Sequence, residues 1–249
     1  MQYIDNHDLA SKGYILVNKS NISNYNQLLA KEEEISKTKM IDMFKANHFA
    51  NKDVVNLESL QEIHYILFSD IYDFAGMIRN YDISSNGYKF EHYRFLVPST
   101  KYFIDQYIAN KSIENAIELY ASMNVIHPFC EGNGRATRFW FDQLLKQDFN
   151  QVVDWSNISP IKYLEAMKLS TSDTNLLQQL ITSNLIDATN LDDYTFFRAI
   201  DRSYEYENLN YIKAQDLEHW DKFCPTKKRC HHAMVISFFF FATPWHYAI

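Results

Sequence analysis

Residues 127–138 carry the densest chemical signal in the chain and read His127-Pro128-Phe129-Cys130-Glu131-Gly132-Asn133-Gly134-Arg135-Ala136-Thr137-Arg138. A helical pattern ends before this segment, a glycine-containing loop follows, and a new helix is expected from about Arg135 to Gln147. The N–H groups of the loop and of the helix start would turn toward one point, which favours an anion the size of phosphate. Arg135 and Arg138 would stand on one side of the first helical turn and bind further phosphate oxygens.

Two titratable residues complete this segment. His127 stands at the entrance of the loop and has a side chain that titrates near neutral pH, so it suits a general base. Glu131 would repel a bare phosphate, and it suits a site for Mg²⁺ that bridges phosphates. Each feature alone has an ordinary explanation as a helix cap, a turn or a solvated surface. Their concentration in one short segment favours a phosphate-handling site.

The segment resembles the Fic motif, His-x-Phe-x-(Asp/Glu)-Gly-Asn-Gly-Arg-x-x-Arg, at every defined position. The resemblance covers residues 51–208 and includes Phe74-Ala75-Gly76, Arg79, Ile83-Ser84, Val153-Asp154-Trp155 and Tyr163-Leu164. It implies the all-α, mostly helical Fic fold with one short β-hairpin. It also implies a protein adenylyltransferase, an enzyme that moves AMP from ATP to a hydroxyl group of a target protein.

The resemblance assigns a role to each matched residue. His127 would deprotonate the target hydroxyl, Glu131 would bind Mg²⁺, and Arg135 and Arg138 would bind the outer phosphates of ATP. The anion cradle would be formed by Gly132, Asn133 and Gly134. Phe129 would be a packing anchor, and Cys130 fills a variable position without a role. A flap hairpin would bind the target by adding a strand to it; its residues are Ile83, Ser84, Ser85, Asn86, Gly87, Tyr88, Lys89 and Phe90.

A second family feature lies downstream, where residues 203–208 read Ser-Tyr-Glu-Tyr-Glu-Asn and fit the inhibitory pattern (Ser/Thr)-x-x-x-Glu-(Gly/Asn). The resemblance then implies a class III protein, with its own C-terminal inhibitory helix over about residues 193–208. Ser203 and Glu207 would share a helix face, and Glu207 would pair with Arg138 and exclude the γ-phosphate. Tyr204, or nearby Tyr206, is expected to expose a hydroxyl that accepts AMP in self-modification. A homo-oligomer that buries this helix is compatible with the same pattern.

The rest of the chain is predicted to be mainly helical, since it contains only five glycines and five prolines. Helices are expected over residues 24–45, 57–74, 112–126, 160–169, 175–184 and 193–207, and Asn86-Gly87 predicts the hairpin turn. The charged residues 31–34 are expected to form a solvated face. We divide the chain into an N-terminal helical extension (1–50), a catalytic domain (51–208) and an atypical tail (209–249) that activity should not require.

Composition limits the class of protein. A net charge of −7 argues against a nucleic-acid-binding protein, and three cysteines do not make a disulfide framework. The first residues do not resemble a signal peptide, and the apolar run 233–243 is too short to span a membrane, so a cytoplasmic protein is expected. Three alternatives stay open: transfer of another phosphate-containing group, removal of AMP, and a non-enzymatic protein-binding regulator. The sequence does not specify the target protein.

Overall fold

The computed structural model describes residues 4–5, 15–85, 87–207, 209 and 212–217. Helices dominate this part of the chain, which confirms the expected fold class. The helices are α2 (Tyr25–Lys45), α3 (Leu57–Phe68), α4 (Leu96–Ala109), α5 (Ile113–Ile126), α6 (Asn133–Phe149), α7 (Pro160–Leu169), α8 (Asn175–Thr182) and α9 (Asp193–Glu205). Short 3₁₀ turns precede α4, α7 and α9.

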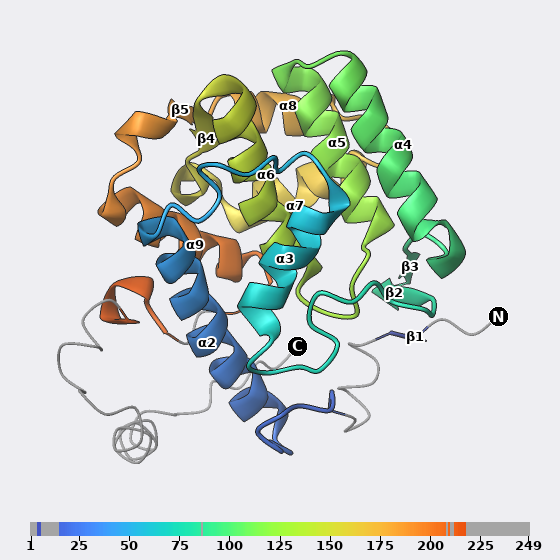
Figure 1. The fold of residues 1–249 in the computed structure, drawn as a ribbon, viewed down its shortest axis with the longest axis vertical. Helices are drawn as coiled ribbons and strands as arrows, with labels where there is room; N and C mark the ends of the chain where they lie inside the picture. Colours follow the sequence, from blue (N-terminus) through green and yellow to red (C-terminus); the bar gives the residue numbers. More distant parts are fainter. Residues whose placement is uncertain (1–3, 6–14, 86, 208, 210–211, 218–249) are drawn as a thin grey trace, which may run out of the picture.

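Helix α6 forms the centre of the fold. Its buried side chains lie on nearly every side of the helix, as expected for a helix enclosed by others. Figure 1 shows α2 and α9 toward one side of α6 and α4 and α5 toward the other. The motif segment runs into the N-terminus of α6, so the helix that carries both motif arginines is also enclosed by other elements. Its large buried apolar residues are Phe139, Trp140, Phe141, Leu144 and Leu145.

Two small sheets accompany the helices. Strands β2 (Ile83–Ser85) and β3 (Tyr88–Lys89) form the expected hairpin, with Gly87 at a φ of 79° in its turn. Strand β1 (Ile4–Asp5) pairs in parallel with the other edge of β2. A second, antiparallel pair joins β4 (Gln151–Val153) to β5 (Leu185–Asp187) and was not expected. Its three-residue strands are too short to show an alternating pattern.

Several helix boundaries differ from the sequence prediction. Helix α3 ends at Phe68 rather than at residue 74, because the chain turns at Ser69 and reaches Gly76 with a φ of 75°. Helix α8 ends at Thr182 and α9 at Glu205, each two residues early. Helix α4 was missed. Pro98 lies in its first turn, where proline is tolerated, but in the sequence it reads as a break.

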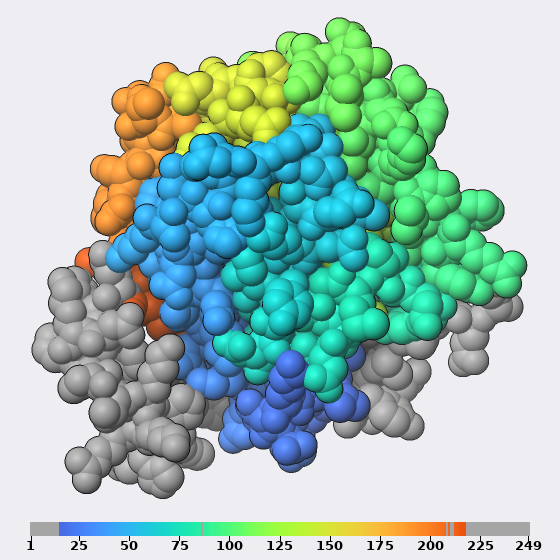
Figure 2. All heavy atoms as spheres, viewed as in Figure 1, coloured from blue at the N-terminus to red at the C-terminus, as the bar shows by residue number. Residues whose placement is uncertain are grey.

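The charged residues 31–34 do not form a solvated face. Glu32 and Glu33 are buried, because α2 packs against α3 and α9, and Glu33 pairs with Lys37 at 2.8 Å. Figure 2 shows α2 and α3, in blue and cyan, side by side across the front of the molecule. The expectation of a solvated face is therefore wrong, because this face of the helix is internal.

The folded unit also extends beyond the predicted boundary at residue 208. Leu209, Ala214 and Leu217 are buried, and the Ala214 N–H donates to Asp201 of α9 at 3.0 Å. The rest of the expected tail, residues 218–249, lies outside the described residues. In the part that is described, no helix combines the length and the apolar character needed to cross a membrane.

Candidate active site

His127 lies where helix α5 ends. It adopts the left-handed conformation, with a φ of 52°, and its N–H still donates to the Met123 carbonyl at 3.0 Å. Nδ1 lies 3.2 Å from the Asn124 carbonyl oxygen and donates to it, which leaves the Nε2 lone pair available. Burial lowers the pKa of His127 to about 4, so the imidazole is neutral at neutral pH. A neutral ring with a free nitrogen can accept a proton.

The motif loop, which leads from His127 to the start of α6, is closed by hydrogen bonds between the Asn133 side chain and Phe129. The Asn133 amide donates to the Phe129 carbonyl at 2.9 Å and accepts from the Phe129 N–H at 2.8 Å. Asn133 was predicted to belong to the anion cradle, but its buried side chain faces the loop. Only its backbone remains for an anion, at the first position of α6.

His64 of α3 supports the same loop and was missed in the sequence. Its Nε2 donates to the Glu131 carbonyl at 2.8 Å, while Nδ1 accepts from the Gly76 N–H at 2.8 Å. The ring stacks on Phe129 with centroids 3.8 Å apart, so Phe129 is the buried anchor that was expected. A histidine within an apolar helix was the available signal, although most such residues have only a packing role.

Arg79 attaches the flap to the end of α5. Its guanidinium donates to the carbonyl oxygens of His127 (2.8 Å) and Ile126 (3.1 Å) on one side, and of Tyr81 (2.7 Å) and Glu91 (2.6 Å) on the other. Phe90, just after β3, stacks on the His127 ring at 3.7 Å. These contacts fix the position of the hairpin relative to His127.

Two glycines of the motif are required by their surroundings. Gly132 has a φ of 74°, and a Cβ atom there would lie 2.4 Å from the Phe68 ring. At Gly134 a Cβ atom would lie 2.4 Å from Glu207 Oε1 and 2.9 Å from Arg138 NH1. A carboxylate therefore lies directly over the first turn of α6, where the backbone N–H groups have no partner within the helix.

Glu207 contacts both motif arginines. Its Oε1 accepts from Arg138 NH2 at 2.7 Å, and its Oε2 lies 2.7 Å from Arg135 Nε, an ion pair without the alignment of a hydrogen bond. Burial alone would raise the pKa of Glu207, but the two guanidinium groups hold it below its usual range.

Ser203 contacts the same guanidinium as Glu207. Its Oγ accepts from Arg138 Nε at 2.7 Å, and its carbonyl accepts from Arg138 NH2 at 2.8 Å. The structure thus places Ser203 and Glu207 at the motif. Glu207 lies two residues beyond the end of α9 and not within the helix.

Glu131 has the character expected of a ligand for a divalent cation. Burial and the nearby charge of Glu32 together raise its pKa to about 7, so a cation at this carboxylate would relieve an unfavourable charge. Among the described residues, no group of three or more His, Cys, Asp or Glu side chains could bind a metal by itself. Mg²⁺ commonly uses one or two carboxylates plus substrate phosphates, and this arrangement fits that pattern.

Comparison with known proteins agrees with this geometry. Residues 54–145 match the model of the Fic/DOC family. This chain contains a Fic/DOC domain. It is 28% identical over 144 residues to the protein adenylyltransferase VbhT of Bartonella schoenbuchensis, a match that covers 54% of this chain and 30% of VbhT. It is also 28% identical over 142 residues to the probable protein adenylyltransferase Fic of Escherichia coli, covering 53% of this chain and 70% of that protein.

Solved structures show the same fold. BepC of Bartonella tribocorum with bound AMPPNP has a TM-score of 0.60 at 20% identity, covering 69% of this chain and 92% of that one. The N-terminal Fic domain of a Bartonella quintana effector with bound ADP has a TM-score of 0.62 at 18% identity, covering 73% and 93%. At this identity the likeness concerns the Fic fold alone.

The tyrosines beside the inhibitory pattern do not expose their hydroxyl groups, so that expectation is wrong for this conformation of the Fic domain. Tyr204 is completely buried and donates to Ser36 Oγ at 2.6 Å. Tyr206 is buried and donates to the carbonyls of Trp155 and Ile158 at 3.1 Å. Neither oxygen can accept AMP while α9 occupies this position.

The flap of the Fic domain is present, but one of its edges is already paired. Strand β2 lies between β3 and β1, so the N-terminal Ile4 and Asp5 occupy the second edge of β2. An incoming target segment that added to this edge would replace β1. Asn86 lies outside the described residues, and the other flap residues lie in or beside the hairpin.

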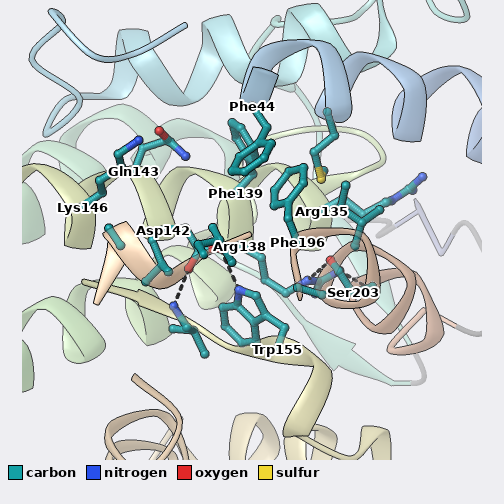
Figure 3. A pocket seen from close by; sticks show the side chains of 17 residues that line it. Phe44, Arg135, Arg138, Phe139, Asp142, Gln143, Lys146, Trp155, Phe196 and Ser203 are labelled. Carbon is teal, nitrogen blue, oxygen red and sulfur yellow. Dashed lines mark hydrogen bonds between the residues drawn. The ribbon is translucent and has the colours of Figure 1, made fainter. Parts of the chain in front are cut away.

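A cavity of about 50 Å³ separates part of α9 from α6. Figure 3 shows Phe44, Phe139 and Phe196 on one side of it and Arg138, Asp142 and Ser203 on the other. Its lining includes both motif arginines but not His127 or Glu131. The cavity therefore lies between the apolar side of α9 and the helices α2 and α6, next to both motif arginines.

Proposed function

We propose that this chain is a protein adenylyltransferase that transfers AMP from ATP to a hydroxyl group of a target protein. One observation carries the proposal. A neutral His127, with its Nε2 free, lies next to the N-terminal end of α6, which contains Gly134, Arg135 and Arg138. A general base next to an anion site is what nucleotidyl transfer requires. The relatives VbhT and Fic bear the name protein adenylyltransferase.

Each residue of the site has a separate role in the proposed reaction. Nε2 of His127 accepts the proton of the target hydroxyl, whose oxygen forms a bond to the α-phosphorus while the bond between that phosphorus and the bridging oxygen breaks. Pyrophosphate leaves with the electron pair of the broken bond. Arg135 and Arg138 bind the outer phosphates. Glu131 would bind Mg²⁺, which would neutralise phosphate charge.

We further propose that Glu207 inhibits the enzyme. Its carboxylate occupies the space over Gly134 and contacts both arginines, so it competes with phosphate oxygens for the same groups. ATP can bind productively only when Glu207 leaves. Because the paired Glu207 is ionised, its removal takes one negative charge away from both guanidinium groups.

Labelled ATP tests the activity and its inhibition together. We expect Glu207→Gly to transfer label from α-labelled ATP into lysate proteins at least ~10-fold faster than the wild type, since each ~1.4 kcal/mol of shifted equilibrium changes the population tenfold. Glu207→Gly with His127→Ala should transfer about 10²–10⁴-fold less than Glu207→Gly. Transfer of γ-label would instead indicate a phosphotransferase, and equal rates for wild type and Glu207→Gly would refute inhibition by Glu207.

A further inference from the structure

Glu32 of α2 reaches the site from a part of the chain that the Fic motif does not include. Its side chain is 1% exposed. One carboxylate oxygen accepts a hydrogen bond from Arg135 NH1, and the other accepts from the Tyr72 hydroxyl. Both oxygens of Glu32 are thus bound to buried donors, and its orientation is fixed from two sides.

Each nitrogen of the Arg135 guanidinium faces a different carboxylate. NH1 donates to Glu32, NH2 lies 3.3 Å from Glu131 Oε1, and Nε lies 2.7 Å from Glu207 Oε2. Glu207 must leave before ATP binds, and Glu131 is the proposed ligand of the cation. Glu32 is the one carboxylate of the three that can remain on Arg135 during turnover.

Two aromatic rings also pack against the guanidinium of Arg135, and only one of them would stay in place when α9 moves. Its guanidinium lies over the Phe68 ring at 5.0 Å and over the Tyr204 ring at 5.5 Å. Tyr204 belongs to α9 and would move with the inhibitory segment. After that movement Glu32 and Phe68 would be the contacts that define the plane and direction of the guanidinium.

We propose that Glu32 is a positioning residue for nucleotide recognition, an inference that rests on the proposed binding of ATP. By occupying NH1, it directs the Nε and NH2 edge of Arg135 toward the space that Glu207 now fills. A guanidinium binds phosphate through two parallel hydrogen bonds only when this edge is aligned. Glu32 therefore acts on the outer phosphates and not on the adenosine or the α-phosphate.

The test compares two nucleotides in the Glu207→Gly protein by calorimetry. AMPPNP has the outer phosphates and AMP lacks them. We expect Glu32→Ala to weaken AMPPNP binding about tenfold, with AMP affinity changed less than about twofold. Glu32→Gln should stay within about threefold for both, because its amide oxygen can accept the same bond from NH1.

Glu33→Gln is the matched control. Glu33 is the next residue on α2, is equally buried and forms an ion pair with Lys37. Its loss should lower stability without changing the ratio of AMPPNP to AMP affinity. An equal change of this ratio in Glu33→Gln would show that α2 acts only as scaffold and would overturn the proposal.

Two further results would also overturn it. An unchanged affinity ratio in Glu32→Ala would show that Arg135 needs no positioning, and tighter AMPPNP binding would show that Glu32 competes with phosphate. If Glu32→Ala does not fold, Tyr72→Phe removes only the second contact of Glu32, and we expect it to weaken AMPPNP alone by about threefold. Absence of AMPPNP binding to Glu207→Gly itself would refute the proposed function instead.

Discussion

The motif loop and the proposed inhibitory segment, from α9 to Glu207, meet at the same two arginines, but they are fixed in different ways. The loop is closed by Asn133 onto Phe129, four residues away, and is supported by buried His64 and Arg79. The inhibitory segment depends on partners far along the chain: Arg138 for Glu207, Ser36 for Tyr204 and Lys37 for Asp201. A cavity lies along its apolar side. The loop is fixed as a permanent part of the fold by contacts within the motif, whereas the inhibitory segment is held by buried apolar side chains and by polar contacts to residues distant in the sequence.

The largest effect should come from the permanent region. We expect His127→Ala in the Glu207→Gly background to reduce AMP transfer by about 10²–10⁴-fold, because the general base is lost. AMPPNP affinity should stay nearly unchanged, since no nucleotide contact is assigned to His127. Transfer is measured with α-labelled ATP and binding by calorimetry. Retention of full transfer would place the base elsewhere.

Asn133→Ala should destabilise the motif loop. The change leaves the Phe129 N–H and C=O without their buried partners, so we expect the free energy of unfolding to fall by about 2–4 kcal/mol. Asn133→Asp is the matched comparison, because it keeps the acceptor for the Phe129 N–H but turns a second, charged oxygen toward the Phe129 carbonyl. Chemical denaturation should therefore place both variants below the wild type. A loss of under about 0.5 kcal/mol in Asn133→Ala would contradict local closure.

The proposed cation site should respond to pH in a direction set by Glu131. Its raised pKa, about 7, means that protons compete with Mg²⁺ below neutral pH, whereas His127, at about 4, does not titrate there. We expect the Mg²⁺ concentration that half-saturates AMPPNP binding to Glu207→Gly to rise up to about tenfold per pH unit below pH 7. Glu131→Gln should bind Mg²⁺ weakly at every pH. If the half-saturating Mg²⁺ concentration of the Glu207→Gly protein did not change with pH, Glu131 would be excluded as the ligand.

The smallest effect should come from one contact of the inhibitory segment. Ser36→Ala leaves the buried Tyr204 hydroxyl without its acceptor only while α9 is docked, so it should raise basal transfer about fivefold, the equivalent of ~1 kcal/mol. Adding Tyr204→Phe removes the orphaned hydroxyl and should return the rate toward wild type. If the double variant is as active as Ser36→Ala alone, this hydrogen bond does not control docking.

The same contrast between local and distant contacts determines how much the sequence could predict. Residues 127–138 are contiguous, so their chemistry and most of their placement could be inferred directly, with the side chain of Asn133 as the exception. Glu207 could be named only because a loose pattern followed a complete motif. Glu32 could not be found, because its partner Arg135 lies 103 residues away and a charged helix face resembles a solvated surface. Helix α4 and the β4–β5 pair carried local signals that were too weak or misleading.

Because residue 134 is a glycine, the proposed inhibition by Glu207 can be lost only in certain ways. Any other residue there would place an atom 2.4 Å from Glu207 Oε1, so the Glu207 carboxylate would have to move away from its present position. The same atom would enter the space that a phosphate needs, so a mutation at this position would release the enzyme and disable it in one step. Variants selected for unrestrained activity should therefore carry changes at Glu207 or along α9 and α2, and the motif itself should stay intact.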